Sequence, residues 1–181
     1  MVDKHKVFIS YYHKDDQNYK DHLLNLNDRF DIFEDYSVHE NEIDDCNMTA
    51  ENIRKEIRDS YIRDATVLIL LSGKNTKMGI LVINLPGTGN AVRASDEDKD
   101  LVSPGGNWIA ISSREEYEKH YPEMPARLIT NFMKADVKIS VVNWDRVSND
   151  IHIMKKLIDN AFGRRKTNNY DHSEPLRRNN S

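Results

Sequence analysis

The stretch KVFISYYH, residues 6–13, decides the fold of this chain. It opens with an unbroken apolar run of β-branched and aromatic residues at 7–9, which is typical of a strand buried on both faces of a parallel sheet. The run ends at a small polar residue, Ser10. Because open α/β sheets bind ligands outside the carboxyl ends of their central strands, where strand order reverses, we expect a binding crevice at residues 10–13.

Composition limits the function classes. The chain has 181 residues, 38% hydrophobic and 31% charged, which suits one globular domain. The net charge of -4 gives no reason to expect a nucleic-acid partner. The single cysteine, Cys46, excludes an internal disulfide and fits a reducing compartment. No apolar run is long enough to cross a bilayer, and the first residues lack a signal-peptide pattern, so we expect a cytoplasmic protein without a membrane partner.

The rest of the chain alternates apolar runs with helical periodicity. Apolar runs predict further strands at 31–33, 66–71, 79–85 and 137–143, with a minor one at 108–111. Helices are expected from Asp15 or Asp16, from Thr49, from Ser113 with Glu116, at 127–134, and from Asn149 to a stop at Gly163. The expected inner faces are Tyr19, Leu23, Leu26 and Phe30; Ile53, Ile57 and Tyr61; and Ile151, Met154, Leu157, Ile158 and Phe162. This alternation predicts a three-layer α/β fold with a mostly parallel five-stranded sheet.

Three segments lack an apolar pattern. The acidic stretch EDYSVHENEIDDCNM, residues 34–48, has no defensible metal-ligand spacing, so we expect a solvated loop and no metal. Residues 87–107 are expected to form a mobile surface loop. Residues 164–181 are expected to be a polar C-terminal tail, which leaves residues 1–163 as the single domain.

One connection is too short for this pattern. Only about six residues, 73–78, separate the third and fourth strands, whereas parallel neighbours normally need a crossover of a dozen or more residues. The two strands could form an antiparallel hairpin, although Asn75-Thr76 is not a favoured turn. The protein could also lack the helix, or the 181-residue sequence could omit residues that the full protein has between Lys77 and Met78. We favour the last explanation, because the remaining pattern is regularly α/β.

Several stretches resemble one protein family when they are taken as an ordered set. They are KVFISYYHKDD, EDYSV, IRDSYIRDATVLILLSGKNT, MGILVINLP, MPARLITN and VVNWDRV. This set, which covers most of residues 6–165, resembles the TIR-like domain of bacterial Thoeris antiphage defence proteins. The resemblance implies a flavodoxin-like TIR fold with strand order 2-1-3-4-5. It also implies cleavage of the nicotinamide–ribose bond of NAD, as substrate rather than cofactor, to make a cyclic ADP-ribose-type signal. The implied partners are an effector protein reached through that diffusible signal, a phage-derived trigger and further copies of the chain.

The resemblance also implies a substrate pocket. The residues that match its walls are Ser10, Tyr11, Tyr12, Asp35, Tyr36, Ser37, Ser72 and Gly73. From the residues alone, the Ser10 hydroxyl could equally bond local backbone. At least one of Tyr11 and Tyr12 is expected in the core, because strand residues alternate faces.

The family's catalytic glutamate is missing from this sequence. In the family it follows a tryptophan on the helix between the third and fourth strands, which would place it between Thr76 and Met78 here, so the catalytic residue is unknown. Asp35 could substitute, although a carboxylate in an acidic loop is more often solvated. The alternative to an enzyme is a catalytically silent TIR-like module that self-assembles or binds a nucleotide. A receiver domain is disfavoured, because Ser72-Gly73 stands where the acceptor aspartate should be. A flavodoxin is disfavoured, because no phosphate loop follows the first strand.

Overall fold

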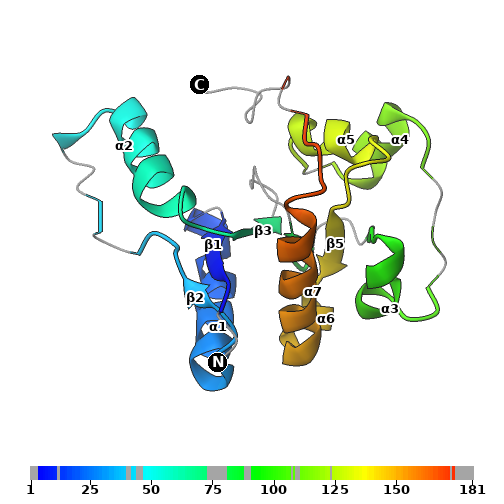
Figure 1. Cartoon of the computed structure of the whole chain (residues 1–181), viewed down its shortest axis with the longest axis horizontal. Helices are drawn as coiled ribbons and strands as arrows, with labels where there is room; N and C mark the ends of the chain where they lie inside the picture. The colour runs from blue at the N-terminus through cyan, green and yellow to red at the C-terminus, as the bar shows by residue number, and fades with distance from the viewer. Residues whose placement is uncertain are drawn as a thin grey trace.

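The sheet is parallel throughout and has the order β2-β1-β3-β4-β5 (Figure 1). This computed structural model describes residues 4–11, 13–39, 42–43, 47–72, 81–87, 91–106, 108, 111–122, 124–171 and 173. The strands are β1 (Lys6–Ser10), β2 (Glu34–Asp35), β3 (Val67–Ser72), β4 (Leu81–Asn84) and β5 (Ser140–Asn143). The order confirms the flavodoxin-like α/β architecture expected from the sequence, with β1 inside the sheet.

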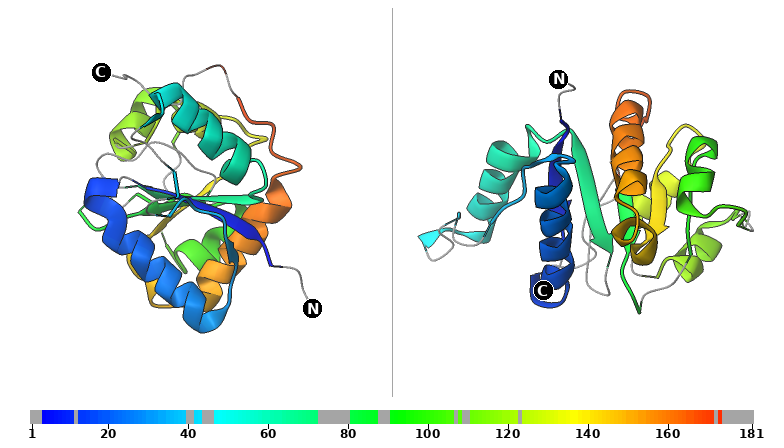
Figure 2. Two further views of the ribbon diagram at one scale, coloured as in Figure 1. Left: turned by 90° about the vertical axis from the view of Figure 1, so that its left-hand side faces the viewer. Right: turned by 90° about the horizontal axis from the view of Figure 1, so that it is seen from below.

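Helices cover the sheet on both sides (Figure 2). They are α1 (His13–Phe30), α2 (Ala50–Glu56), the π-helix η2 (Ile57–Ile62), the 3-10 turn η3 (Asp96–Asp98), α3 (Lys99–Val102), α4 (Arg114–His120), α5 (Ala126–Phe132), α6 (Trp144–Ser148) and α7 (Ile151–Arg164). The predicted caps at Thr49 and at Ser113 with Glu116 are confirmed, since each side chain accepts the expected backbone N–H.

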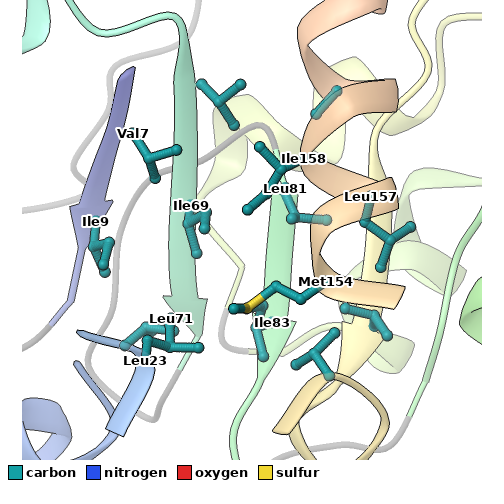
Figure 3. Packing of buried hydrophobic residues seen from close by; sticks show 14 of the residues in the cluster. Val7, Ile9, Leu23, Ile69, Leu71, Leu81, Ile83, Met154, Leu157 and Ile158 are labelled. Carbon is teal, nitrogen blue, oxygen red and sulfur yellow. The ribbon is translucent and has the colours of Figure 1, made fainter. Parts of the chain in front are cut away.

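The larger core lies between the sheet and the helices α1 and α7 (Figure 3). Alternate residues of the strands point to this side, among them Ile9, Ile69 and Ile83, which are at most 2% exposed. They meet Leu23 from α1 and Met154 from α7, as the helical spacing predicts. A second core on the opposite face joins β3, β4 and β5 to α4 and α5.

The second strand begins later than predicted. Asn27 of α1 accepts the backbone N–H groups of Ile32 and Phe33, at 3.0 and 2.9 Å. Those two residues are buried, but their donors are bound to Asn27, so pairing with β1 starts only at Glu34. The inward position predicted for Phe30 is also wrong, because this ring is 51% exposed. The helix α1 is about 27 Å long and overruns a strand of about 17 Å, which leaves its last turn beyond the sheet.

Part of the predicted surface loop at 87–107 is folded. The turn η3 and the helix α3 occupy residues 96–102, where Asp98 and Val102 are buried. The minor strand expected at 108–111 is not seen at Trp108 or Ile111, and residues 109–110 lie outside the described residues.

The expected tail from residue 164 packs on the domain as far as Asp171. Arg164 is 6% exposed and bonds buried Asp98 at 2.6 Å. Asn168 donates to the carbonyl of Lys138 and accepts its N–H, and Asn131 exchanges two hydrogen bonds with the backbone of Asp171. These contacts are polar, so the boundary drawn after residue 163 from apolar patterning does not mark where the packing ends.

The short connection joins parallel neighbours, so the hairpin explanation is wrong. In the register of the two strands, Leu81 pairs with Ile69 and Asn84 with Ser72. The chain must therefore return by about three strand residues, roughly 10 Å. Residues 73–80 can reach that far, because eight extended residues span up to about 28 Å. They are too few to form a crossover helix that covers the sheet.

The face of the sheet over β1 and the start of β3 lies outside both core clusters of the described residues. After the first crossover the strand order runs in the opposite direction, so right-handed connections favour the face opposite α1 for the later crossovers, although α3 of the β4–β5 connection packs Val102 into the core with α1 and α7. On that face, buried Phe8 and half-buried Leu68 belong to neither core cluster. No described side chain of α2 or η2 is buried, so the inner face predicted for that helix is at most half-buried, and Figure 1 shows α2 leaning away from the strands.

Candidate functional site

Strand order reverses between β1 and β3, so the carboxyl ends of these two strands are the candidate site for a crevice. The helix α1, which follows β1, covers one face of the sheet here. Ser10 pairs with Leu70, which places Ser72 just beyond the end of β1. The structure thus brings the predicted residues Ser10, Tyr11 and Ser72 to one edge. Tyr12, Gly73 and the side chain of Ser72 lie outside what the structure describes.

Tyr11 is held against α1 rather than pointing free. Its hydroxyl donates to Gln17 at 2.7 Å, and Gln17 in turn donates to Asp21 at 2.7 Å. The ammonium of Lys20 lies 5.1 Å from the centroid of the Tyr11 ring, so a cation occupies one face of this ring. The half-buried ring also packs against the larger core, which matches the expectation that one of the two tyrosines serves the core.

The loop after β2 follows β1 towards the crevice. Its Ser37 is 2% exposed, and the Ser37 hydroxyl accepts the N–H of Ile9 at 2.9 Å. Asp35 accepts the N–H of Ser37 at 2.9 Å and lies 2.9 Å from Nε2 of His39. Ser37 therefore ties the loop to β1, whereas Asp35 shapes the loop from within, and the Asp35 carboxylate already has two partners.

Tyr36 points to the other side of this loop. The ammonium of Lys6 lies 4.7 Å from the centroid of the Tyr36 ring, at the start of β1 rather than at its carboxyl end. The hydrogen bond to Tyr36 raises the pKa of the half-buried Lys6. Tyr36 therefore contacts the start of β1, away from the carboxyl ends of β1 and β3.

Lys20 also lies in this region, although no sequence pattern marked it as a candidate site residue. Its side chain is 3% exposed, and Nζ donates to the carbonyl of Val38 at 2.8 Å. Burial lowers the pKa of Lys20, an effect partly offset by the carboxylates of Asp35, Asp21 and Glu42. A lysine inside an otherwise polar helical turn normally indicates a solvated face, so only the fold reveals its burial.

Asparagines end the next two strands. Nδ2 of Asn84, in β4, donates to the Ala91 carbonyl at 2.7 Å and to Oδ1 of Asn143, in β5, at 3.1 Å. Trp144 follows β5, and its ring packs edge-on to Tyr19 of α1, with 4.9 Å between centroids. These contacts close the carboxyl edge of the sheet with neutral groups, and their only sequence signal is a polar residue directly after each apolar run.

The next question is whether the described residues form a metal site. Among the residues that the structure describes, no group of three His, Cys, Asp or Glu side chains is arranged to hold a metal ion. In the same part of the chain, no helix has the length and apolar character needed to cross a membrane.

This edge of the sheet offers, among the described residues, the Ser10 hydroxyl and the Tyr11 ring, groups that can contact a nucleotide. It lacks an obvious acid or base at the third strand, because residues 73–80, GKNTKMGI, contain no Asp or Glu.

Comparison with known families gives one match. The family model for the TIR-like domain of the Thoeris protein ThsB matches residues 8–82. No curated protein and no solved structure matches the chain. The matched range begins in β1 and ends in β4, so it includes the loops after β1 and β2 and the short β3–β4 connection. Residues 8–82 are thus similar to the TIR-like domain of a Thoeris protein, and the 2-1-3-4-5 sheet agrees with the fold expected of that domain.

Proposed function

We propose that the protein cleaves NAD at the crevice between β1 and β3 and makes a cyclic ADP-ribose-type signal in antiphage defence. The family match supports this assignment. The proposal places the missing catalytic carboxylate on a crossover segment between Lys77 and Met78 that the 181-residue sequence lacks. The short connection between the parallel strands β3 and β4 carries this proposal, because parallel neighbours normally need a crossover of a dozen or more residues.

The chemistry explains why a carboxylate is required. Loss of nicotinamide develops positive charge on the ribose, and a nearby carboxylate can offset that charge and orient the ribose hydroxyls. Hydroxyls and aromatic rings cannot supply a negative charge. In this proposal Ser10, Tyr12, Ser72 and Gly73 line the substrate, Tyr11 forms the crevice wall, and Asp35 and Ser37 shape its rim. Tyr36 keeps a role only if the loop rearranges around the nucleotide.

The proposed partners follow from a diffusible product. The signal would activate a separate effector in the cytoplasm, after a phage-derived trigger or self-association switches the enzyme on. No membrane, nucleic acid or resident cofactor takes part.

Incubation of the purified protein with NAD, with and without phage-infected lysate, tests this function. Chromatography should detect nicotinamide together with a cyclic product. Ser10→Ala should reduce the rate about 10-fold or more, the size expected for losing one hydrogen bond to substrate. Ser112→Ala, on an exposed serine before α4, is the matched control and should leave the rate unchanged. No nicotinamide release under either condition would contradict the enzyme assignment.

A silent TIR-like module is the second candidate, favoured by the absence of Asp and Glu from residues 73–80. Such a module would bind NAD or ADP-ribose without converting it, or would act by self-assembly. Calorimetry that detects binding of intact NAD, without release of nicotinamide, would support this candidate over the enzyme.

A further inference from the structure

The burial of Lys20 has no explanation in the packing of α1 alone. This side chain is 3% exposed, whereas helical lysines normally keep their ammonium group in water. Its Nζ leaves its own helix and reaches the loop after β2, where it donates to the Val38 carbonyl at 2.8 Å. The lysine therefore joins α1 to a loop that is otherwise anchored to β1.

Beside the backbone bond from the Tyr36 N–H to the Val7 carbonyl, two side-chain contacts join the loop of residues 35–39 to the end of β1 and to α1. One is the hydroxyl of Ser37, which accepts the N–H of Ile9 next to the end of β1. The other is Lys20, which lies between the loop and the ring of Tyr11. One ammonium group thus contacts both the loop and the first residue after β1, the two walls described on this side of the crevice.

Three carboxylates near Lys20 favour the charged form of its ammonium group. Asp35 at the start of the loop, Asp21 on α1 and Glu42 beyond the loop are the carboxylates that act on it. Their attraction offsets part of the cost of removing the ammonium group from water. A methylene chain alone could fill the space, but it could neither satisfy the Val38 carbonyl nor balance Asp35.

We propose that Lys20 is a positioning residue that fixes the loop of residues 35–39 and the Tyr11 ring, so that this side of the nucleotide crevice is formed before the ligand binds. The nucleotide part of this inference rests on the proposed function. The positional part rests on the contacts alone. Preorganisation of this kind raises affinity, because the loop does not have to be ordered on binding.

Amide hydrogen exchange and NAD binding by Lys20→Met and Lys20→Arg test the inference. In Lys20→Met the amides of Ile9 and Ser37, whose acceptors are Ser37 and Asp35, should exchange about 10-fold faster or more. The amide of Ile83, in the buried strand β4, should keep its protection. Lys20→Arg retains a charged donor and should restore most of the protection. Lys156→Met removes an exposed lysine of α7 and is the matched control. Lys20→Gln replaces Lys20→Met if the latter does not fold, with the same expectation.

The two readouts separate the inference from the function on which it rests. With NAD as the probe, Lys20→Met should raise Kd about 10-fold, and Lys156→Met should leave it unchanged. Unchanged exchange at Ile9 and Ser37 in the folded variant would overturn the positioning role. Faster exchange with unchanged NAD affinity would overturn the role in the crevice. Faster exchange in a protein whose wild type binds no NAD would support the loop anchor and contradict the nucleotide assignment.

Discussion

Asp98 and Arg164 form the most deeply buried ion pair among the described residues. Asp98 is fully buried, and Arg164 bonds it at 2.6 Å from the last turn of α7. The hydroxyl of Ser140 also contacts Asp98, and Asn160 donates to its other oxygen at 2.6 Å. The carboxylate is therefore satisfied from β5 and α7 at once, and the turn η3 is fixed to the sheet.

Arg164→Met should destabilise the fold by about 3–5 kcal/mol, because it leaves the buried Asp98 carboxylate without its cation. Urea unfolding measures this free energy. Arg165→Met is the control. It removes an exposed arginine that lies over the Phe162 ring, and should cost no more than about 1 kcal/mol. A loss below about 1 kcal/mol in Arg164→Met would show that the pair does not hold η3 in place.

The pKa of Lys20 gives a prediction of pH dependence. Burial lowers this pKa below 10.5, the ordinary value that the unfolded chain keeps. Between the two values the unfolded chain binds a proton that the folded chain has lost, so stability rises with pH. The free energy of unfolding of the wild type relative to Lys20→Met should therefore increase as the pH is raised from neutrality to 10.5. A constant or falling difference would mean that the lysine is not desolvated.

At this scale the sequence predicted where the first strand ends better than what the side chains there contact. Ser10 and Tyr11 follow from a strand that ends at a polar residue, and both lie at the carboxyl end of β1. The role of Lys20 could not be predicted, because a lysine in a polar turn looks the same whether its ammonium group meets water or a carbonyl. The direction of Tyr36 depends on the late start of β2, which no local pattern shows.

The junction of α1 and β2 is decided by one asparagine. Asn27 accepts two backbone N–H groups and donates to the Phe33 carbonyl at 3.0 Å. The turn also places Asp31 at a φ of 54°, a conformation that few residues other than glycine and asparagine adopt.

Asn27→Ala should cost about 1–3 kcal/mol, since it leaves partly buried backbone groups without partners. Thermal or urea unfolding measures the loss. Asn25→Ala, two residues earlier on the exposed side of α1, should stay within about 0.5 kcal/mol of the wild type. Equal stability of the two variants would rule out Asn27 as the determinant of the strand start.

Elements whose signals are local were predicted well. The buried strands follow from their apolar runs, and the helix starts at Thr49 and Ser113 follow from capping side chains. The helices at 96–102 were missed, because their burial depends on a single charged residue, Asp98, paired from the far end of the chain. The polar contacts beyond residue 164 escaped prediction for the same reason.

The two faces of the whole molecule differ in how far they are filled. The helices α1 and α7 close one face with a continuous core, and α4 and α5 close the other beside β4 and β5. The helix α2 and the π-helix η2 contribute no buried described residue. The strand order could be predicted through the family resemblance. How well each face of the sheet is covered by helices could not, because it depends on the length of the β3–β4 connection.

Amides of α2 should therefore exchange with solvent much faster than those of α7, because few buried contacts oppose local opening. Hydrogen exchange followed by mass spectrometry can compare residues 50–62 with residues 151–164. Equal protection of both helices would mean that α2 is packed on the molecule after all. Addition of NAD should slow exchange in the loop of residues 35–39 before it affects α2.

The absent carboxylate and the short β3–β4 connection meet at one place in the sequence, the link between Lys77 and Met78. Our account predicts a segment there that carries both the covering helix and the catalytic glutamate. Intact mass spectrometry of the protein made from its own gene tests this most directly. A mass above 21.1 kDa by roughly a kilodalton or more, the size of a dozen-residue crossover, is the predicted result. A mass of 21.1 kDa would contradict the account and leave a TIR-like module without its catalytic carboxylate.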